Sequence, residues 1–448
     1  MKIKSSKQAE PSVQVLHIST CDNSGGAERA AYRLHRALLQ TGIASGMLVS
    51  DKRSDDERVV MPNHSRRIDH RLRRFSRRKL IAIEERRIAK SRQPESEYFS
   101  SARTAFTEIW RNIGARASVL NLHMVARFVD YSSFFAALPR GMPFVWTLHD
   151  INAFTGGCHY SNRCDKFVSR CGACPQLGST REYDISRRAF NLKSRAFGNL
   201  DVDRASFVAP SAWMAGEARR SALLGQFRIE HIPNGLDLDI FRPVDRNAAR
   251  TSFGIQVHER VILFVSHFLD SHRKGLDLFL SAVGALKDKS NVVLISVGNG
   301  YAPKVDGMRT IHLGRVYSDL VLSLAYNVAD VFVIPSREEN LALTATEAIA
   351  CGCPVVGFAV GGMPDIVEDG RTGFLAAPLD VLQLKGAIEA AIARRDELSA
   401  ACRTRAERLF SLETQARAYT KLYLELQTRP AVRPATIAPG RVQTNYAS

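Results

Sequence analysis

The chain has 448 residues, which is long for a single hydrophobic core and predicts two domains. Hydrophobic residues make up 45% of it, as in ordinary globular proteins, and no apolar run approaches the roughly 20 residues that span a membrane. The net charge is +17, from 62 Lys and Arg against 45 Asp and Glu, so nucleic acids and anionic membranes both have to be weighed as partners.

The N-terminal residues up to 12 lack the apolar segment of a signal peptide, so we expect the chain to stay in the cytoplasm. A buried strand is predicted over 13–18, followed by a loop that carries Gly25 and Gly26 and by an amphipathic helix that ends near Leu39. A glycine pair before a helix lets a substrate approach the backbone at an electropositive helix start, although a plain turn would look the same.

A basic insertion is predicted at 57–95, where residues 66–92 carry twelve Lys or Arg against three Asp or Glu. Ile68, Leu72 and Phe75 share one helical face, and the rest of the helix is cationic. A nucleic-acid interface would interleave aromatic residues with the charges, and only one is present. An anionic membrane surface fits an amphipathic basic helix better, with a solvated insertion as the alternative.

Strands are predicted over 119–123 and 144–148, and the second one ends at His149 and Asp150. A Cys-rich knuckle follows at 155–177, with four cysteines in the spacing C-x5-C-x6-C-x2-C, namely Cys158, Cys164, Cys171 and Cys174. Four thiolates suit a tetrahedral structural zinc, for which His159 could compete as a ligand. Reduced structural thiols are the alternative, because the first spacing is looser than in common zinc ribbons.

The second half of the chain alternates strands and helices at short spacing, which predicts parallel sheets covered on both faces. Its most informative run is a strand over 331–334, a loop with Glu339 and a helix over 341–350 with Glu347. A helix start attracts phosphate, and two carboxylates could bind ribose and sugar hydroxyls. Two glutamates eight positions apart are common, however, and could equally be a solvated loop residue and an ordinary helix contact.

The residues around these glutamates read P-S-x-x-E-x7-E-A-x-A-x-G-x-P-V-V from Pro335 to Val356, followed by a Gly-Gly pair and D-G-x-x-G-F-L. This pattern resembles the donor-binding motif of family-4 retaining glycosyltransferases of the GT-B fold, and the resemblance covers most of residues 13–427. The sequence pattern around the cysteines resembles that of a subset of bacterial exopolysaccharide and colanic-acid-type transferases.

The resemblance implies two Rossmann-like domains that face a central cleft. The acceptor-side domain is expected over 11–238 and the nucleotide-sugar domain over 239–405. A helix over 406–428 is expected to cross back to the first domain, and residues 429–448, which include three prolines, are expected to be a disordered tail.

The resemblance also implies the roles of the site residues. His149, with Asp150 as its orienter, and Glu339 are expected to act on the sugar. The substrate-binding residues are expected to be Gly25, Gly26, Arg273, Lys274, Asn340, Leu341 and Glu347. The family usually has an arginine where this chain has His267, so either Arg273 or His267 is expected to contact the diphosphate beside Lys274.

The activity that the resemblance implies is transfer of a sugar from a nucleotide-diphosphate sugar to a hydroxyl of a saccharide, often lipid-linked, acceptor with retention, in exopolysaccharide or other cell-surface polysaccharide synthesis. Cations and helix dipoles would stabilise the leaving diphosphate, so no cofactor is required for catalysis. The enzyme is expected at the inner face of the plasma membrane. A non-catalytic nucleotide-sugar-binding or membrane-associated protein on the same scaffold is the alternative, and the departure at His267 favours it.

Overall fold

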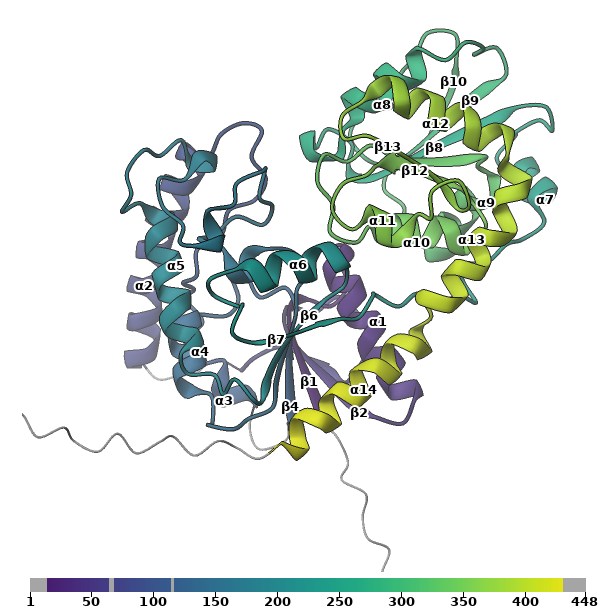
Figure 1. Cartoon of the computed structure of the whole chain (residues 1–448). Coiled ribbons are helices and arrows are strands. Elements are labelled where there is room, and N and C mark those ends of the chain that lie inside the picture. Colours follow the sequence, from purple (N-terminus) through teal and green to yellow (C-terminus); the bar gives the residue numbers. More distant parts are fainter. Residues whose placement is uncertain (1–13, 64–67, 114–116, 430–448) are drawn as a thin grey trace, which may run out of the picture.

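The structure is a computed structural model, and it describes residues 14–63, 68–113 and 117–429. Two open parallel sheets form the centres of two domains that lie side by side (Figure 1). The sheet of the first domain has seven strands in the order β3-β2-β1-β4-β5-β6-β7. Their bounds are β1 Gln14–Cys21, β2 Ala44–Asp51, β3 Val59–Val60, β4 Val119–Leu122, β5 Phe144–Thr147, β6 Ala205–Ala209 and β7 Arg228–His231.

Helices cover both faces of the first sheet. On one face α1 (Gly26–Gln40) and α14 (Leu412–Thr428) pack against strand residues such as Val145. The other face packs against four helices, which are α3 Trp110–Ile113, α4 Tyr131–Ala137, α5 Ile185–Phe197 and α6 Ala212–Arg220. The central strands β4, β5 and β6 are buried along their whole length, as parallel strands covered on both faces must be.

The sheet of the second domain has six strands in the order β10-β9-β8-β11-β12-β13. Their bounds are β8 Arg260–Phe268, β9 Val292–Asn299, β10 Arg309–His312, β11 Val331–Ile334, β12 Val355–Phe358 and β13 Gly373–Ala376. Alternate side chains of β11 belong to two different cores, since Val331 and Val333 pack with one and Phe332 and Ile334 with the other. The helices of this domain are α7 Arg246–Ser252, α8 Leu276–Gly284, α9 Asp319–Val328, α10 Leu343–Ala350, α11 Met363–Ile366, α12 Val381–Ala393 and α13 Arg395–Leu409.

The C-terminal helix α14 returns to the first domain, where Figure 1 shows it in yellow along the first sheet. Its Tyr419 and Tyr423 are fully buried, and their hydroxyls bond to Thr147 at 2.8 Å and to Asn121 at 2.7 Å. Burial of each such side chain contributes roughly 1.5–3 kcal/mol, so this helix is an integral part of the first domain. The predicted GT-B arrangement, with a crossing helix at the end, is confirmed.

The segment expected to cross, 406–428, contains the end of α13 and all of α14. The two helices separate at Phe410 and Ser411, where the Ser411 hydroxyl caps α14 by accepting from the Thr414 N–H. Of residues 429–448, for which a tail was predicted, only Arg429 lies in the described part of the chain. None of the helices that the structure describes is long and apolar enough to cross a lipid bilayer.

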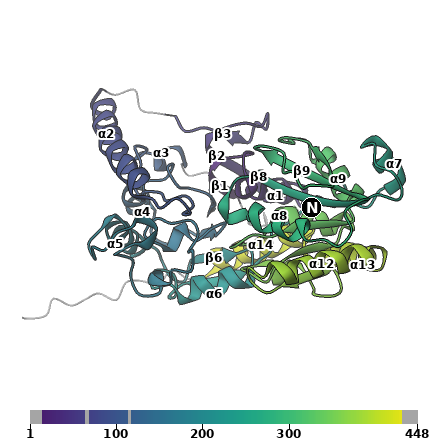
Figure 2. The same cartoon turned by 90° about the horizontal axis from the view of Figure 1, so that it is seen from above.

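The predicted basic insertion contains the long helix α2 (Ile68–Ser91), on the side of the first domain that lies away from the second domain (Figure 2). The side chains of residues 68–74 lie outside the description, so the predicted stripe can be followed only at Phe75, which is 57% exposed. Leu80 and Ile83 on the same helix are also exposed. Arg77 instead points toward the domain, where it pairs with the buried Asp130.

Candidate functional site

The carboxyl ends of the central strands of both sheets meet at the cleft. A cavity of about 340 Å³ lies there, and it contains several of the residues singled out in the sequence. From the first domain it is lined by Gly26, His149 and Asp150, and from the second by His267, Arg273, Lys274, Glu339, Asn340 and Leu341. A second cavity of about 240 Å³ adjoins it and is lined by residues that include Gly25, Gly26 and Glu347.

Glu339 lies in the loop that leaves the buried strand β11, and its carboxylate is 7% exposed. The loop is held by close packing, because a Cβ on Gly361 would lie 1.7 Å from the Glu339 carbonyl oxygen. Lys274 Nζ lies 2.7 Å and an Arg273 nitrogen 3.1 Å from one Glu339 oxygen. Burial alone would raise the pKa of Glu339, but these two cations hold it down at about 2. Glu339 is therefore a carboxylate and a very weak base.

Lys274 and Arg273 belong to a short turn after β8, at the start of α8. The turn ends at Gly275, whose φ is +71° and whose Cβ, if it had one, would lie 2.1 Å from the Pro335 carbonyl oxygen. Only glycine fits a left-handed conformation with so close a contact. The tight turn brings both cations beside the loop that follows β11, although they are more than 60 positions away from it in the sequence.

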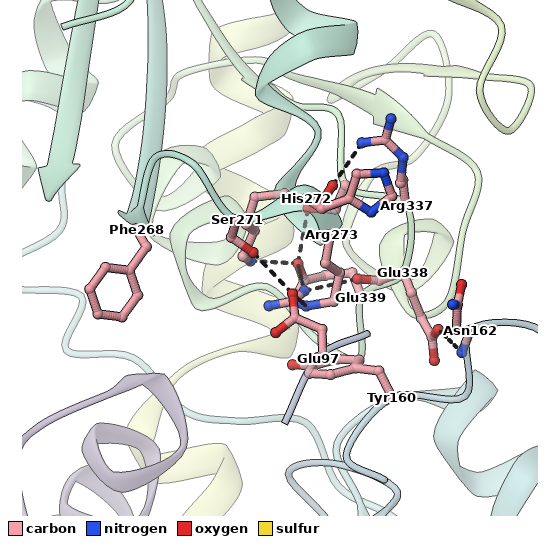
Figure 3. A network of polar contacts seen from close by, with 12 residues as sticks. Glu97, Tyr160, Asn162, Phe268, Ser271, His272, Arg273, Arg337, Glu338 and Glu339 are labelled. Atoms are coloured by element: carbon pink, nitrogen blue, oxygen red, sulfur yellow. Dashed lines mark hydrogen bonds and ion pairs between the residues drawn. The ribbon is translucent and has the colours of Figure 1, made fainter. Parts of the chain in front are cut away.

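The Arg273 guanidinium is enclosed by groups from both domains, and Figure 3 shows Glu97 and Tyr160 of the first domain beside it. It lies 4.0 Å from the centre of the Tyr160 ring and 3.6 Å from a Glu97 oxygen, and it donates to the Glu338 carbonyl oxygen at 2.9 Å. His267 lines the same cavity, but it is exposed and stacks edge-on against Phe268. Of the two candidates for the diphosphate contact, Arg273 is the one beside Lys274.

Glu347 lies in α10 and is almost completely buried. Its two oxygens accept hydrogen bonds from Arg33 at 2.9 Å and from the Tyr326 hydroxyl at 3.2 Å. Arg33 comes from α1 of the first domain and also pairs with Asp319, as does Arg29 one turn earlier. The sequence reading missed this contact between the domains. The only available signal was a pair of arginines four positions apart just after the glycine pair.

Asn340 and Leu341 also bring the domains together. The Asn340 amide donates to the carbonyl oxygens of Leu148 and His149 at 3.0 and 2.9 Å, and its oxygen accepts from the Ser211 hydroxyl at 2.8 Å. Leu341 is 7% exposed and lines the cavity. Asn340 therefore fixes the strand end that carries His149 against the second domain.

The structure differs from the prediction that Asp150 orients His149. Asp150 accepts from His159 at 2.6 Å, and His149 contacts His123 at 3.0 Å. Burial lowers the pKa of His149 to about 4, against a partial opposing effect of Asp150, so its imidazole is neutral above about pH 5. This arrangement could not be predicted from the order of the residues, because the side chains of two adjacent residues at a strand end point in different directions and meet different neighbours.

The four cysteines of the knuckle are all free thiols. Burial raises the pKa of Cys171 to about 12, and its sulfur accepts from the Gly156 N–H at 3.2 Å. His159, the competing ligand, uses both ring nitrogens, one for Asp150 and the other for Ser100 at 2.8 Å. Among the residues that the structure describes, no group of three or more His, Cys, Asp or Glu is arranged to hold a metal ion. The four thiols nevertheless lie near one another, since the pKa of Cys158 is raised first by burial and then by Cys171, Cys174 and Cys164. The zinc site and its alternative of reduced thiols both stay predictions.

Two sequence models of known families match the chain, one in each domain. The model described as Glycosyltransferase Family 4 matches residues 24–240, and the one described as Glycosyl transferases group 1 matches residues 259–394. The two together span most of the chain. It belongs to the family-4, or group 1, glycosyltransferases, which have the GT-B fold.

Among curated proteins, a D-inositol 3-phosphate glycosyltransferase of Geodermatophilus obscurus is 34% identical over 229 residues, which are 47% of this chain and 50% of that protein. The protein of the same name from Mycobacterium tuberculosis is 38% identical over 172 residues, 36% of this chain and 35% of its own length. The chain thus spans half or less of the length of these relatives. Neither is named as an exopolysaccharide or colanic-acid enzyme.

Solved structures agree in fold. Sucrose-phosphate synthase of Thermosynechococcus elongatus has a TM-score of 0.62 at 20% identity, covering 92% of this chain and 99% of that one. HepE of Anabaena, solved with UDP-glucose, has a TM-score of 0.62 at 16% identity, covering 91% and 98%. Identities this low establish the shared fold alone.

Proposed function

We propose that this chain transfers a sugar from a nucleoside diphosphate sugar to a hydroxyl of a saccharide acceptor, with retention of configuration. The observation that carries the proposal is the meeting of two cations and two buried carboxylates beside the start of α10, with a neutral histidine facing them from the other domain. The family membership supports this activity, and the UDP-glucose bound by the Anabaena neighbour supports this class of donor.

In this proposal each part of the donor has its own partners. The diphosphate binds Arg273, Lys274 and the free N–H groups at the start of α10. The ribose hydroxyls bind Glu347, and the hydroxyls of the sugar bind Glu339. Without substrate these charges neutralise one another, since Glu339 pairs with Lys274 and Arg273. A phosphate that binds the two cations therefore releases Glu339 to accept from the sugar.

The proposed reaction breaks the bond between the anomeric carbon and the phosphate oxygen and forms one to the acceptor oxygen on the same face of the sugar. The acceptor proton passes to the departing diphosphate. A terminal phosphate, whose second pKa is about 6, is basic enough to take that proton as its bond to the sugar breaks. Positive charge on Arg273 and Lys274 stabilises the leaving group, so the step requires no cofactor.

The donor assignment is tested by nucleotide release from a panel of UDP-, GDP- and ADP-sugars, with free saccharides and a membrane lipid extract as acceptors. Glu347→Ala should weaken binding of the free nucleoside diphosphate, because it loses the ribose contact. Glu339→Ala should bind it normally but stop transfer. Glu397→Ala, which changes an exposed glutamate on α13, is the control. Normal binding and normal transfer in both site variants would refute the proposal.

The acceptor is proposed to be a lipid-linked saccharide of cell-surface polysaccharide synthesis, met at the inner face of the plasma membrane. Helix α2 supports this, because its exposed apolar residues Phe75, Leu80 and Ile83 lie among basic ones. Each basic residue near an anionic surface adds on the order of 1 kcal/mol of attraction. Salt should weaken this attraction, since the charges are exposed.

The membrane assignment is tested by sedimentation with liposomes. The triple variant Arg78→Glu, Lys79→Glu and Arg86→Glu should lose binding to anionic liposomes and keep donor hydrolysis. Arg77 is left unchanged because it pairs with the buried Asp130 and its loss would destabilise the domain. Unchanged sedimentation of the triple variant would identify α2 as a solvated insertion.

A further inference from the structure

Three histidines of the first domain form a line that ends at the cleft. His17 lies within β1, His123 directly follows β4, and His149 follows the end of β5. These strands are neighbours in the order β1-β4-β5, so residues distant in sequence lie side by side at one edge of the sheet. No contact among these three histidines was predicted from the sequence.

The line is continuous at the level of single atoms. His17 Nδ1 lies 2.9 Å from His123 Nε2, and His123 Nδ1 lies 3.0 Å from His149 Nε2. The rings of His123 and His149 are stacked, with their planes 26° apart. Both contacts thus have hydrogen-bond length, and Nδ1 of His149 is the ring nitrogen left for the cavity that this residue lines.

A neutral imidazole has one N–H and one lone pair, so each contact can hold only one hydrogen. Burial lowers the pKa of all three histidines, which keeps the line uncharged at neutral pH. A line of neutral rings can run in two directions. Either His149 presents an N–H to the cavity and the last acceptor is at His17, or His149 presents a lone pair and the last N–H is at His17.

The far end of the line distinguishes the two directions. His17 Nε2 is buried, and it has no hydrogen-bond partner among the residues that the structure describes. A buried N–H without an acceptor is rarer in proteins than an acceptor without a donor. Hydrogens therefore point from His17 toward His123 and from His123 toward His149. In that direction the Nδ1 of His149 carries a hydrogen.

We propose that His17 and His123 are positioning residues that hold His149 as a neutral Nδ1–H donor to a sugar oxygen of the bound donor. The inference rests on the proposed function, since the sugar is the group that the N–H would meet. Charge explains why a neutral donor suits this place. The sugar becomes positively charged as its bond to phosphate breaks, and an imidazolium there would repel it.

The first test reads the tautomer directly and needs no substrate. In the full chain labelled with ¹⁵N-histidine, the two ring nitrogens of His149 give different shifts according to which one carries the hydrogen. The His149 signals are assigned by their loss in His149→Asn. We expect the Nδ1–H form, and an Nε2–H form in the wild-type protein would overturn the proposal. This measurement requires no turnover of a donor, so its result is the same whether or not the proposed transfer activity is found.

A matched pair of variants tests the role of the line. His123→Asn keeps an amide that can donate to His149 Nε2, whereas His123→Leu cannot donate. With the donor that the panel selects, kcat should fall about tenfold or more for the leucine variant, as when one hydrogen-bond donor to a transition state is misplaced. The asparagine variant should retain most of it. Binding of free nucleoside diphosphate should not change in either.

The leucine variant should also lose the Nδ1–H form of His149 in the ¹⁵N spectrum, while the asparagine variant keeps it. A leucine variant with wild-type kcat, or an asparagine variant as impaired as the leucine one, would overturn the role given to His123. If a variant fails to fold, the inference can still be refuted, because the spectrum of the wild-type protein tests it alone.

Discussion

The two walls of the cleft are built in different ways. The wall of the second domain comes largely from one continuous stretch, the strand β11, its loop and α10, with the Arg273–Lys274 turn beside it. The wall of the first domain is assembled from separate segments, among which Arg33, Glu97, His123, His149 and Tyr160 span more than 120 positions. The first kind of wall can be recognised in a sequence, and the second becomes visible only in three dimensions.

The contacts within the two walls also differ in charge. The groups of the second wall are charged and pair with one another, as Glu339 does with Lys274. The histidines of the first wall are uncharged and contact one another through single hydrogens. The wall of the second domain is therefore suited to hold an anionic leaving group, and the wall of the first domain is suited to contact the uncharged sugar beside it.

The largest loss is expected from Lys274→Ala in the second wall. It removes a cation from the proposed diphosphate site and leaves the buried Glu339 paired, among the described residues, with Arg273 alone. Truncating one member of a buried charge pair costs about 2–5 kcal/mol, and we place this change at the upper end. The measurement is kcat/KM with the best donor, and Lys385→Ala on α12 is the control. A loss below about tenfold would mean that charge in this wall contributes little.

Arg273→Ala should cost less, about 2 kcal/mol of transition-state stabilisation, because Lys274 remains in place. His267→Ala should have a still smaller effect, since that side chain is exposed and, within the described part of the chain, forms no ion pair like those of Arg273. Steady-state kinetics of the two variants side by side measure the ranking. If the ranking is reversed, His267 contacts the diphosphate and the arginine serves only to join the domains.

The sequence was sufficient for the fold because its signals are local, whereas the residues of the second wall were singled out through the family resemblance. Buried strands alternate with helices at short spacing, and the spacing from Glu339 to Glu347 is fixed by one loop and one helix. Such patterns are set by residues close in the chain, which is what a reading of periodicity can detect.

The contacts of the first wall could not be predicted for the same reason. Whether His149 meets Asp150 or His123 depends on the strand order β1-β4-β5, and chain order does not reveal it. The thiol cluster shows the same limit. Four cysteines in a suggestive spacing lie near one another, but in the described part of the chain no group of three or more ligands is arranged to hold a metal ion, and spacing alone does not reveal that arrangement.

Acid should weaken the first domain before the second. The pKa of His35 and of His149 is lowered to about 4 by burial, and that of His17 and His123 is lowered too. The unfolded chain takes up protons near pH 6.5, whereas the folded one takes them up only at lower pH, near pH 4 at His35 and His149, so stability falls as pH falls below about 6.5. Each histidine contributes roughly 1 kcal/mol per pH unit.

Urea unfolding at pH 7.5 and pH 5.5 measures this effect. The three tryptophans, Trp110, Trp146 and Trp213, all lie in the first domain, so their fluorescence reports on it alone. The lowered pKa values of carboxylates such as Asp22 and Asp150 bear on stability only at lower pH, near their usual range. A first domain equally stable at both pH values would mean that these histidines are not buried as neutral groups.

The smallest effect is expected where the two walls touch, at Glu97. This carboxylate lies 3.6 Å from Arg273 and accepts from Ser271 at 3.0 Å, so it occupies the neighbourhood that the proposal gives to the diphosphate. Glu97→Gln should leave Arg273 freer and tighten binding of nucleoside diphosphate by up to about threefold, since partly exposed pairs contribute below about 1 kcal/mol. Isothermal titration measures the affinity, with Glu95→Gln as control, since Glu95 and Glu97 line one further cavity of about 700 Å³. Weaker binding would show instead that Glu97 supports Arg273 rather than competing for it, and that the first wall takes part in holding the anion.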